Sequence, residues 1–255
     1  MPYKITLIGS GNMAWNLGHV LLKHGQIIQQ VISKNPAHAK ELADKIQAKS
    51  SGSIADLDSS SDIILLCVKD EAIAEVAAQI NLNRQVVAHC SGSIPMDVLA
   101  KTSFCYGVFY PLQTLTKNAL KDFMTVPVCV EGNNKEAEEI LFTLADSISN
   151  LVHRINSTQR LHLHLAAVIA NNFTNYLYSA AKEILDEHQL PFDLLKPLIL
   201  ETAKNVQQFP PASVQTGPAK RRDEVVIQKH LALLSAHPDW QRLYQLITEQ
   251  IQKQS

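Results

Sequence analysis

The chain has 255 residues, 46% of them hydrophobic, which is enough for one large or two modest domains with a real core. A formal net charge of −1, without a basic run that carries interleaved aromatic residues, excludes a typical nucleic-acid-binding protein. No apolar stretch reaches the length of a membrane span, and the first apolar run predicts a strand rather than a signal peptide. We therefore expect a cytoplasmic protein without a membrane or nucleic-acid partner.

The first predicted elements are a buried strand over residues 3–8 and a helix over residues 12–24. Between them runs Gly9-Ser10-Gly11-Asn12-Met13-Ala14, which has the pattern G-x-G-x-x-A. A glycine-rich turn between a strand and a helix is typical of dinucleotide-binding units. The alternative is a glycine turn that only joins the two elements.

Each position of this turn has an expected function in dinucleotide binding. Gly9 permits a tight turn, and Gly11 lets the backbone approach a pyrophosphate. The N–H groups and the positive dipole end of the helix then face the phosphates. The cofactor-binding residues predicted here are Gly9, Ser10, Gly11, Asn12 and Met13.

The second predicted strand, residues 27–32, ends in Ser33, Lys34 and Asn35, and no acidic residue precedes Glu41. An NAD site usually has an acid about 20 residues after the glycine turn, where it binds the ribose hydroxyls. Ser33, Lys34 and Asn35 are suited instead to hold a 2′-phosphate. The sequence thus favours NADP(H) over NAD(H), although Lys34 as a solvated loop lysine is the alternative.

Strands and helices continue to alternate up to residue 156, which predicts an α/β, doubly wound and mainly parallel sheet. Asp70 is the expected N-cap of a helix after the strand at residues 62–68. Four widely spaced cysteines without a C-x-x-C pattern predict buried, reduced thiols. The remaining predicted strands lie near Ser53-Ile54 and over residues 85–89, 104–110, 126–130 and 151–155, and helices cover residues 37–48 and 134–149.

Residues 157–255 predict an all-helical second domain that serves substrate binding or dimerisation. A helix over residues 158–188 leads it, and further helices are expected over residues 193–206, 223–235 and 238–253. Residues 209–218, rich in proline and small polar side chains, predict a loop. Because the leading helix is rich in apolar positions and has few partners within about 100 residues, we expect a homodimer.

The carboxyl ends of parallel strands meet at one edge of the sheet, where ligands bind. This rule places Val68 and Lys69 along the cofactor, and Ser91 with Gly92 near the reacting groups. His89 and Tyr110 are possible proton donors at this edge. The alternatives are a core histidine and a packing aromatic residue.

The leading helix carries His164, Asn171 and Asn175 on one face, with Asn172 beside it. Asparagines are poor helix formers, so such a cluster predicts either substrate binding or hydrogen bonding between helices. The spacing of the histidines does not suit a metal site. Gly217 to Asp223 is a basic loop in which paired arginines could clamp a carboxylate or the cofactor phosphate, or simply be solvated.

The order of these segments resembles the superfamily of pyrroline-5-carboxylate reductases, deazaflavin-dependent NADP reductases and β-hydroxyacid dehydrogenases. It resembles more closely a bacterial branch of Rossmann-like proteins with a C-terminal domain of unknown function. The motifs that carry this resemblance are GSGNMA from Gly9, HCSGS from His89, YPLQT from Tyr110, HLAAVIANNF from His164 and GPAKRRD from Gly217.

The resemblance implies hydride transfer between NADP(H) and a C=O or C=N carbon of a small metabolite. Ser91, Asn171 and Asn172 would then orient the substrate, and His164 or Tyr110 would donate the proton. Arg221 would bind a substrate carboxylate.

Two departures from the related groups bear on the chemistry. Val168 and Ala167 stand where the dehydrogenases have a lysine one turn before the asparagine, and Tyr110 replaces an expected histidine. The missing lysine favours a second hypothesis, a non-catalytic regulatory or sensor protein that binds NADP(H).

Overall fold

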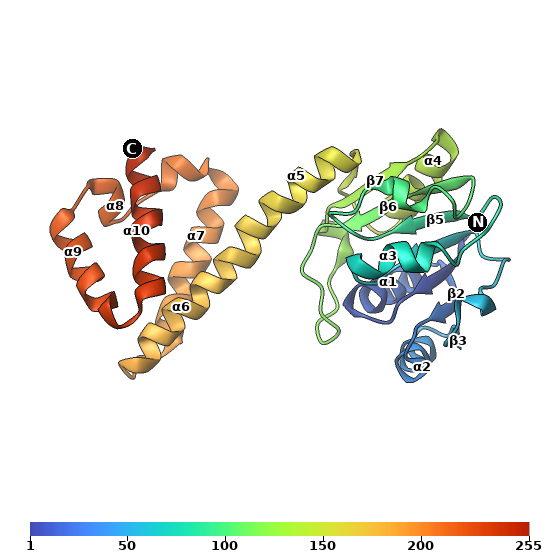
Figure 1. Cartoon of the computed structure of the whole chain (residues 1–255), viewed down its shortest axis with the longest axis horizontal. Coiled ribbons are helices and arrows are strands. Elements are labelled where there is room, and N and C mark those ends of the chain that lie inside the picture. The colour runs from blue at the N-terminus through green and yellow to red at the C-terminus, as the bar shows by residue number, and fades with distance from the viewer. Residues whose placement is uncertain (255) are drawn as a thin grey trace. The chain divides into compact units, whose positions relative to one another are not determined.

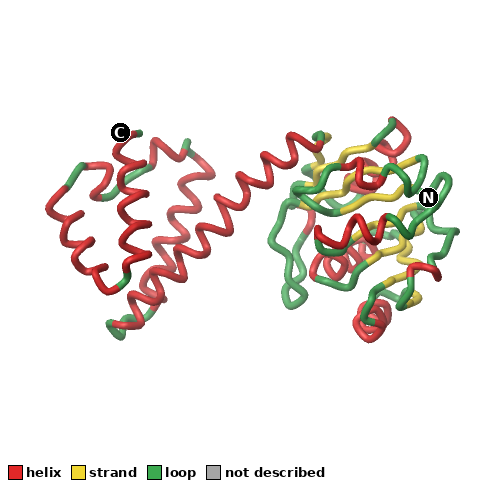
Figure 2. Tube along the Cα trace, viewed as in Figure 1, coloured by secondary structure: helices red, strands yellow, loops and turns green. Residues whose placement is uncertain are grey.

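The computed structural model describes residues 1–254 and divides the chain into two compact units, Met1–Ala170 and Asn171–Ser255 (Figure 1). The division falls later than the expected boundary after residue 156. Helix α5, Ser157–Ala167, belongs to the first unit because its buried Arg160 is bonded to the sheet and to a loop beside it. All eight strands also lie in this unit, as the yellow segments of Figure 2 show.

One sheet of eight strands in the order β3-β2-β1-β4-β5-β6-β7-β8 forms the centre of the first unit. All neighbouring pairs are parallel except β6 with β7. This is the expected doubly wound, mainly parallel arrangement. The strands are β1 Lys4–Ile8, β2 Ile27–Ile32, β3 Lys49–Ser51, β4 Ile63–Leu66, β5 Val86–His89, β6 Cys105–Pro111, β7 Val128–Gly132 and β8 Val152–Arg154.

Helices cover both faces of this sheet because alternate side chains of each buried strand point to opposite faces. In β4, Ile63 and Leu65 pack into the core beneath α1, α2 and α4, whereas Ile64 and Leu66 pack against α3. The continuous apolar runs seen in the sequence are therefore explained by burial on two sides. The helices of the sheet are α1 Asn12–Lys23, α2 Pro36–Lys45, α3 Asp70–Ala77 and α4 Lys135–Asp146.

Two local predictions were wrong. The strand expected near Ser53-Ile54 lies earlier, at β3, and Ser53 instead caps a 3₁₀ turn by accepting the Ala55 N–H. Asp70 is not the N-cap of α3 but its first helical residue, since Lys69 holds the extended N-cap position. The Asp70 carboxylate accepts a hydrogen bond from Ser93 Oγ at 2.5 Å.

The long helix predicted over residues 158–188 is interrupted by a turn of different geometry. Helix α5 passes into a π-helical segment, Val168–Phe173, before α6, Thr174–Glu187, begins. π-Helical segments are rare and are often found at functional sites. The structure thus changes its helical period at the segment that contains Asn171 and Asn172.

The second unit is entirely helical in its described part. Helix α10 packs against α8 and α9, and Asp223 caps α9 by accepting the Val226 N–H at 3.1 Å. The predicted loop at residues 209–218 contains a 3₁₀ turn, Pro211–Val214. Its helices after α6 are α7 Lys196–Gln208, α8 Pro218–Arg221, α9 Glu224–Leu233 and α10 Pro238–Lys253.

Candidate functional site

The glycine turn has the geometry that the sequence predicts. Gly9 has a φ of +121°, and a Cβ there would lie 2.4 Å from the backbone oxygen of Cys67. Only glycine fits this position, since both the conformation and the neighbouring strand exclude a side chain. The adjacent Ser10 is buried, and its hydroxyl lies 2.9 Å from that of Ser33, which joins the turn to the end of β2.

Helix α1 begins at this turn, and no side chain caps its N-terminus. Gly11 is the N-cap, no side chain caps the helix, and no acidic residue occurs in the first turn. A Cβ on Gly11 would meet no atom within 4 Å, so the space in front of it is open. Uncapped N–H groups and the helix dipole make this position suitable for an anion such as a pyrophosphate.

Beside the glycine turn, the residues after β2 have partners that the sequence did not reveal. The ammonium group of Lys34 lies 2.8 Å from a carboxylate oxygen of Glu75 on α3. The side-chain oxygen of Asn35 caps α2 by accepting the N–H groups of Ala37 and His38. Of the three residues predicted to hold a 2′-phosphate, only Ser33 bonds to the glycine turn itself.

On the far side of β1, Val68 and Lys69 follow β4 as expected. Val68 is half-buried, whereas Lys69 is exposed and lies 3.9 Å from a carboxylate oxygen of Glu71. Both residues therefore stand at the carboxyl edge of the sheet, next to the strand that supports Gly9.

Two proton-donor candidates, 54 residues apart in sequence, are in direct contact. The hydroxyl of Tyr110, at the end of β6, lies 3.0 Å from Nδ1 of His164 on α5. Gly92 makes this contact possible, because a Cβ there would lie 2.6 Å from His164 Nδ1 and 2.8 Å from Tyr110 Cζ. The structure thus brings Tyr110 and His164 together against Gly92. We call Tyr110 and His164 the Tyr-His pair.

Burial controls the protonation of the Tyr-His pair. Tyr110 is buried, and desolvation raises the pKa of its phenol to about 12, with smaller contributions from nearby charged groups. The phenol therefore keeps its proton near neutral pH, and its oxygen lies within hydrogen-bonding distance of His164 Nδ1. The imidazole of His164 is partly exposed.

His89 and Ser91 stabilise the loop that carries Gly92. The His89 side chain is fully buried, and its Nδ1 accepts the Ser91 N–H at 3.2 Å. Burial, and then the positive charge of Arg160, lowers the pKa of His89 to about 4, so the ring is neutral. The hydroxyl oxygen of Ser91 accepts the N–H groups of Ser93 and Ile94, both at 3.1 Å. His89 is thus a core histidine, as the alternative interpretation held.

Arg160 is a site residue that sequence reasoning missed. It lies one helical turn before His164, and its side chain is buried at 1% exposure. The guanidinium pairs with Glu131 of β7 and donates to the backbone oxygen of Ile94. A buried arginine on a mostly polar helix turn has no clear sequence signature, although its spacing of four from His164 puts both on one face.

A second missed feature is the loop after β6, residues 112–122. The Lys117 N–H donates to Asn12 Oδ1 at 3.2 Å, and the Lys117 ammonium group lies 5.1 Å from the centre of the Trp15 ring. Asn16 Nδ2 donates to the backbone oxygen of Thr116 at 3.0 Å. This loop is therefore attached to the first turn of α1, beside the predicted pyrophosphate position.

Asn171 and Asn172 begin the second unit, and both are exposed. In the same unit, Arg221 ends the short helix α8 and is exposed. Arg222 follows with a φ of +54° and donates to the backbone oxygen of Gln252. Within the basic loop, the side chain of Arg222 thus bonds to the C-terminal end of α10, and that of Asp223 caps α9.

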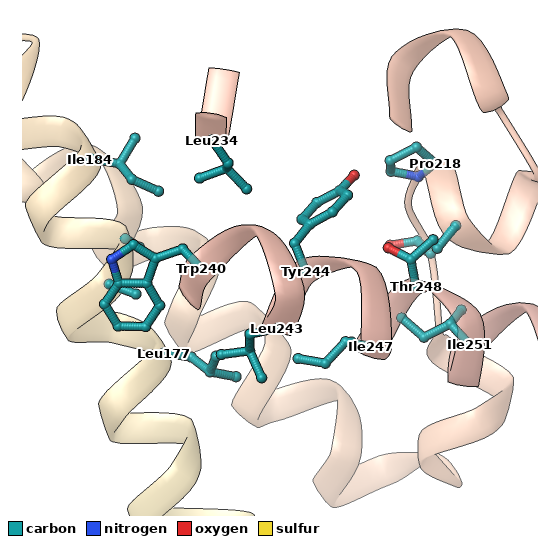
Figure 3. Close-up of a pocket in the computed structure, with 14 residues that line it drawn as sticks. Leu177, Ile184, Pro218, Leu234, Trp240, Leu243, Tyr244, Ile247, Thr248 and Ile251 are labelled. Atoms are coloured by element: carbon teal, nitrogen blue, oxygen red, sulfur yellow. The ribbon is translucent and has the colours of Figure 1, made fainter. Parts of the chain in front are cut away.

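The helical unit also contains an apolar cavity of about 340 Å³ between α6, α8 and α10 (Figure 3). Leu177 and Ile184 line it from α6, and Trp240 and Tyr244 from α10. The Tyr244 hydroxyl lies 2.9 Å from His230 Nδ1. The cavity contains no cluster of charged groups and therefore lacks the features of a catalytic site.

Along residues 1–254, no helix combines the length and apolar character that crossing a bilayer requires. Within the same residues, no three His, Cys, Asp or Glu side chains gather in an arrangement that could ligate a metal ion.

Two family models match different parts of the chain. A model described as "NADP oxidoreductase coenzyme F420-dependent" matches residues 4–91. A model described as a domain of unknown function, DUF2520, matches residues 126–251. Among curated protein sequences, none matches this chain.

Solved structures match over almost the whole length. A "putative NADP oxidoreductase" from Bacteroides fragilis is 40% identical, with a TM-score of 0.92, and the match covers 99% of this chain and 98% of that one. A protein from Thermotoga maritima is 24% identical, with a TM-score of 0.75 and coverage of 98% and 97%. A 1-pyrroline-5-carboxylate reductase from Streptococcus pyogenes is 15% identical, with a TM-score of 0.67 and coverage of 99% of both chains. The last two likenesses concern the fold alone.

Proposed function

The chain belongs to the Rossmann-like oxidoreductases whose C-terminal part is the domain DUF2520, and from this membership we propose that it is an NADP(H)-dependent oxidoreductase. Its substrate is a small metabolite with a reactive C=O or C=N carbon. When bound, the nicotinamide supplies or accepts the hydride, and the protein supplies position and protons.

The observation that carries this proposal is the open glycine turn at the bare N-terminus of α1. A side chain at Gly9 would collide with Cys67, whereas a Cβ on Gly11 would meet no protein atom within 4 Å. We assign the pyrophosphate to the N–H groups around Ser10, Asn12 and Met13, which an uncapped helix leaves in need of acceptors. Val68 and Lys69 are assigned to the neighbouring edge of the cofactor.

The preference for NADP(H) over NAD(H) is assigned to the end of β2. Ser33, Lys34 and the amide nitrogen of Asn35 are donors suited to a 2′-phosphate. The segment between β2 and α2 has no carboxylate that would repel this group. The ammonium group of Lys34 is solvent-exposed and is free to exchange its partner, since exposed ion pairs are weak.

We assign proton transfer to the Tyr-His pair. With the phenol of Tyr110 donating to Nδ1, His164 presents an Nε2–H group that can be given to the substrate. As the Nε2 proton leaves, the phenol passes its proton to Nδ1, and the tyrosinate that forms takes a proton from water before the next turnover. This division of roles explains why two candidate donors occur in one contact.

Substrate orientation is assigned to Ser91, Asn171 and Asn172, and binding of a substrate carboxylate to Arg221. Amide and hydroxyl groups can hold a carbonyl or imine without competing for its proton. Arginine suits a carboxylate because its guanidinium forms two parallel hydrogen bonds.

We further propose a cytoplasmic homodimer. Only Ala180, Ala219 and Ile227 are buried apolar residues among residues 171–254, which is too small a core for a unit of this size. Large apolar side chains are exposed instead, and their burial against a second copy would stabilise the unit. The wide spacing of the four cysteines along the chain, without a C-x-x-C pattern, supports a reducing compartment.

The test is a titration of the purified protein with NADPH, followed by incubation with imines, keto acids and deazaflavins. Consumption of NADPH with one substrate class supports the oxidoreductase. Binding without consumption throughout the panel favours the regulatory or sensor alternative.

The matched variant is Gly11→Asp, which should abolish NADPH binding by placing a carboxylate where the pyrophosphate lies. Because aspartate is a good N-cap and its Cβ meets no atom, the free energy of unfolding should be unchanged or slightly raised. Unchanged NADPH affinity in this variant would exclude the assigned cofactor site.

A further inference from the structure

The ion pair between Lys34 and Glu75 joins two elements that are 41 residues apart in sequence. Lys34 follows β2, where the dinucleotide-binding pattern usually has an acidic residue. Glu75 lies on α3, and its carboxylate oxygen lies 2.8 Å from the Lys34 nitrogen. A carboxylate of α3 therefore holds the one cation in the segment between β2 and α2.

We propose that Glu75 determines dinucleotide preference by competing with the 2′-phosphate for the ammonium group of Lys34. This inference rests on the proposed function, and in particular on a dinucleotide bound at the glycine turn. Glu75 is a specificity-determining residue here and has no part in the reaction itself.

The charges explain how such a competition operates. A 2′-phosphate must take Lys34 from Glu75 and then remain near the displaced carboxylate, which repels it. NADH carries neutral hydroxyls at this position, so neither step affects its binding. The chain thus binds NADPH less tightly than it would without the Glu75 carboxylate. The affinities for NADPH and NADH therefore differ less than Ser33 and Lys34 alone would make them differ.

The surroundings of the pair strengthen this effect. Glu71 lies one helical turn before Glu75 on α3, and it pairs with Lys69, another residue assigned to the cofactor. Both cations assigned to the cofactor are therefore paired with carboxylates of one helix. The Lys34 and Glu75 side chains are 76% and 60% exposed, so the competition is moderate and depends on salt.

The experiment measures the dissociation constants of NADPH and NADH for the wild type, Glu75→Gln and a matched control. Glu75→Gln should tighten NADPH binding about two- to fivefold and leave NADH binding unchanged, and the gain should shrink at high salt. The control, Asp44→Asn, removes an equally exposed carboxylate from the Lys40 pair on α2. It should change neither constant.

A second pair of variants tests whether the effect passes through Lys34. Lys34→Ala should weaken NADPH binding. The double variant Lys34→Ala/Glu75→Gln should recover only the part of the affinity that is lost to direct repulsion between Glu75 and the 2′-phosphate. Equal NADPH affinity of Glu75→Gln and the wild type would overturn the proposal. So would a loss of NADH affinity in Glu75→Gln, since Glu75 would then bind the ribose hydroxyls. A wild type that binds neither dinucleotide would instead overturn the proposed function, and this inference with it.

Discussion

The sequence predicts Tyr110 and His164 as alternative proton donors, and it does not predict that the two side chains touch. Only the fold could pair them, because a contact across 54 residues depends on how α5 packs on the sheet. Arg160 was missed for the same reason, since its partners Glu131 and Ile94 are brought to it by the fold.

Gly92 is expected to be intolerant of even a methyl group. Gly92→Ala should lower the free energy of unfolding by about 1–3 kcal/mol, because its Cβ would overlap His164 and Tyr110. Urea unfolding measures this change. Gly52→Ala is the control, and it should cost less than Gly92→Ala because its Cβ would meet only the Pro36 ring, at 3.1 Å. An equal loss in both variants would contradict the close contact at Gly92.

Buried His89 should make the protein sensitive to mild acid. Burial lowers the pKa of His89 in the folded state to about 4, below its ordinary value of about 6.5, so its contribution to stability is complete above about pH 6.5. As the pH falls towards 4, His89 becomes protonated in the unfolded chain but stays neutral in the folded state. This residue alone should then cost up to about 3 kcal/mol of stability.

His89→Gln tests this dependence, since glutamine can accept the Ser91 N–H but does not titrate. Urea unfolding between pH 7 and pH 4 should give a shallower decline for His89→Gln than for the wild type. His38→Gln, which changes an exposed histidine of α2, is the matched control. The same decline in His89→Gln and the wild type would exclude His89 as the source.

At the scale of elements, periodicity predicted most boundaries within a few residues. β2 and α10 have the expected bounds, because an apolar strand and an amphipathic helix with proline at its start leave little choice. β3 was misplaced because Lys49–Ser51 is short and polar, and only its pairing with β2 makes it a strand. The π-helical segment was also unpredictable, since its residues fit an ordinary helix.

The ion pair between Arg160 of α5 and Glu131 of β7 is expected to contribute strongly to stability. Arg160→Met should lower the free energy of unfolding by about 3–5 kcal/mol, because it leaves the Glu131 carboxylate half-paired and nearly buried. The double variant with Glu131→Gln should lose less than the sum of the two single variants. A double-mutant cycle by urea unfolding measures this coupling, and simple additivity would argue against a direct pair.

At the scale of the whole molecule, the two units differ in how they are stabilised. The first unit buries apolar side chains on both faces of its sheet, as the sequence predicted. The second has few buried residues, and a sequence cannot tell whether an apolar helix face meets its own domain or another copy. The following side chains along the leading helical run are exposed: Leu161, Leu165, Ile169, Phe173 and Tyr176.

If this face forms the proposed homodimer, Leu165→Glu should shift the protein to monomer, because a charge cannot be buried there without a partner. Light scattering at several concentrations measures the mass. Phe104→Glu changes a side chain of the sheet unit that is 67% exposed, and it should leave the dimer intact. A wild-type protein that is monomeric at all concentrations would contradict the proposed homodimer.

The hydrogen bond from the Lys117 N–H to Asn12 Oδ1 links the loop at residues 112–122 to the proposed cofactor site, so the loop should respond when a dinucleotide binds. Asn12 lies in the helical turn assigned to the pyrophosphate, and the loop that carries Lys117 bonds to it from outside. Hydrogen–deuterium exchange in residues 112–122 should therefore slow when a dinucleotide binds and steadies that turn. The state of the cofactor site could thus be read from a peptide remote in sequence, before any substrate is known.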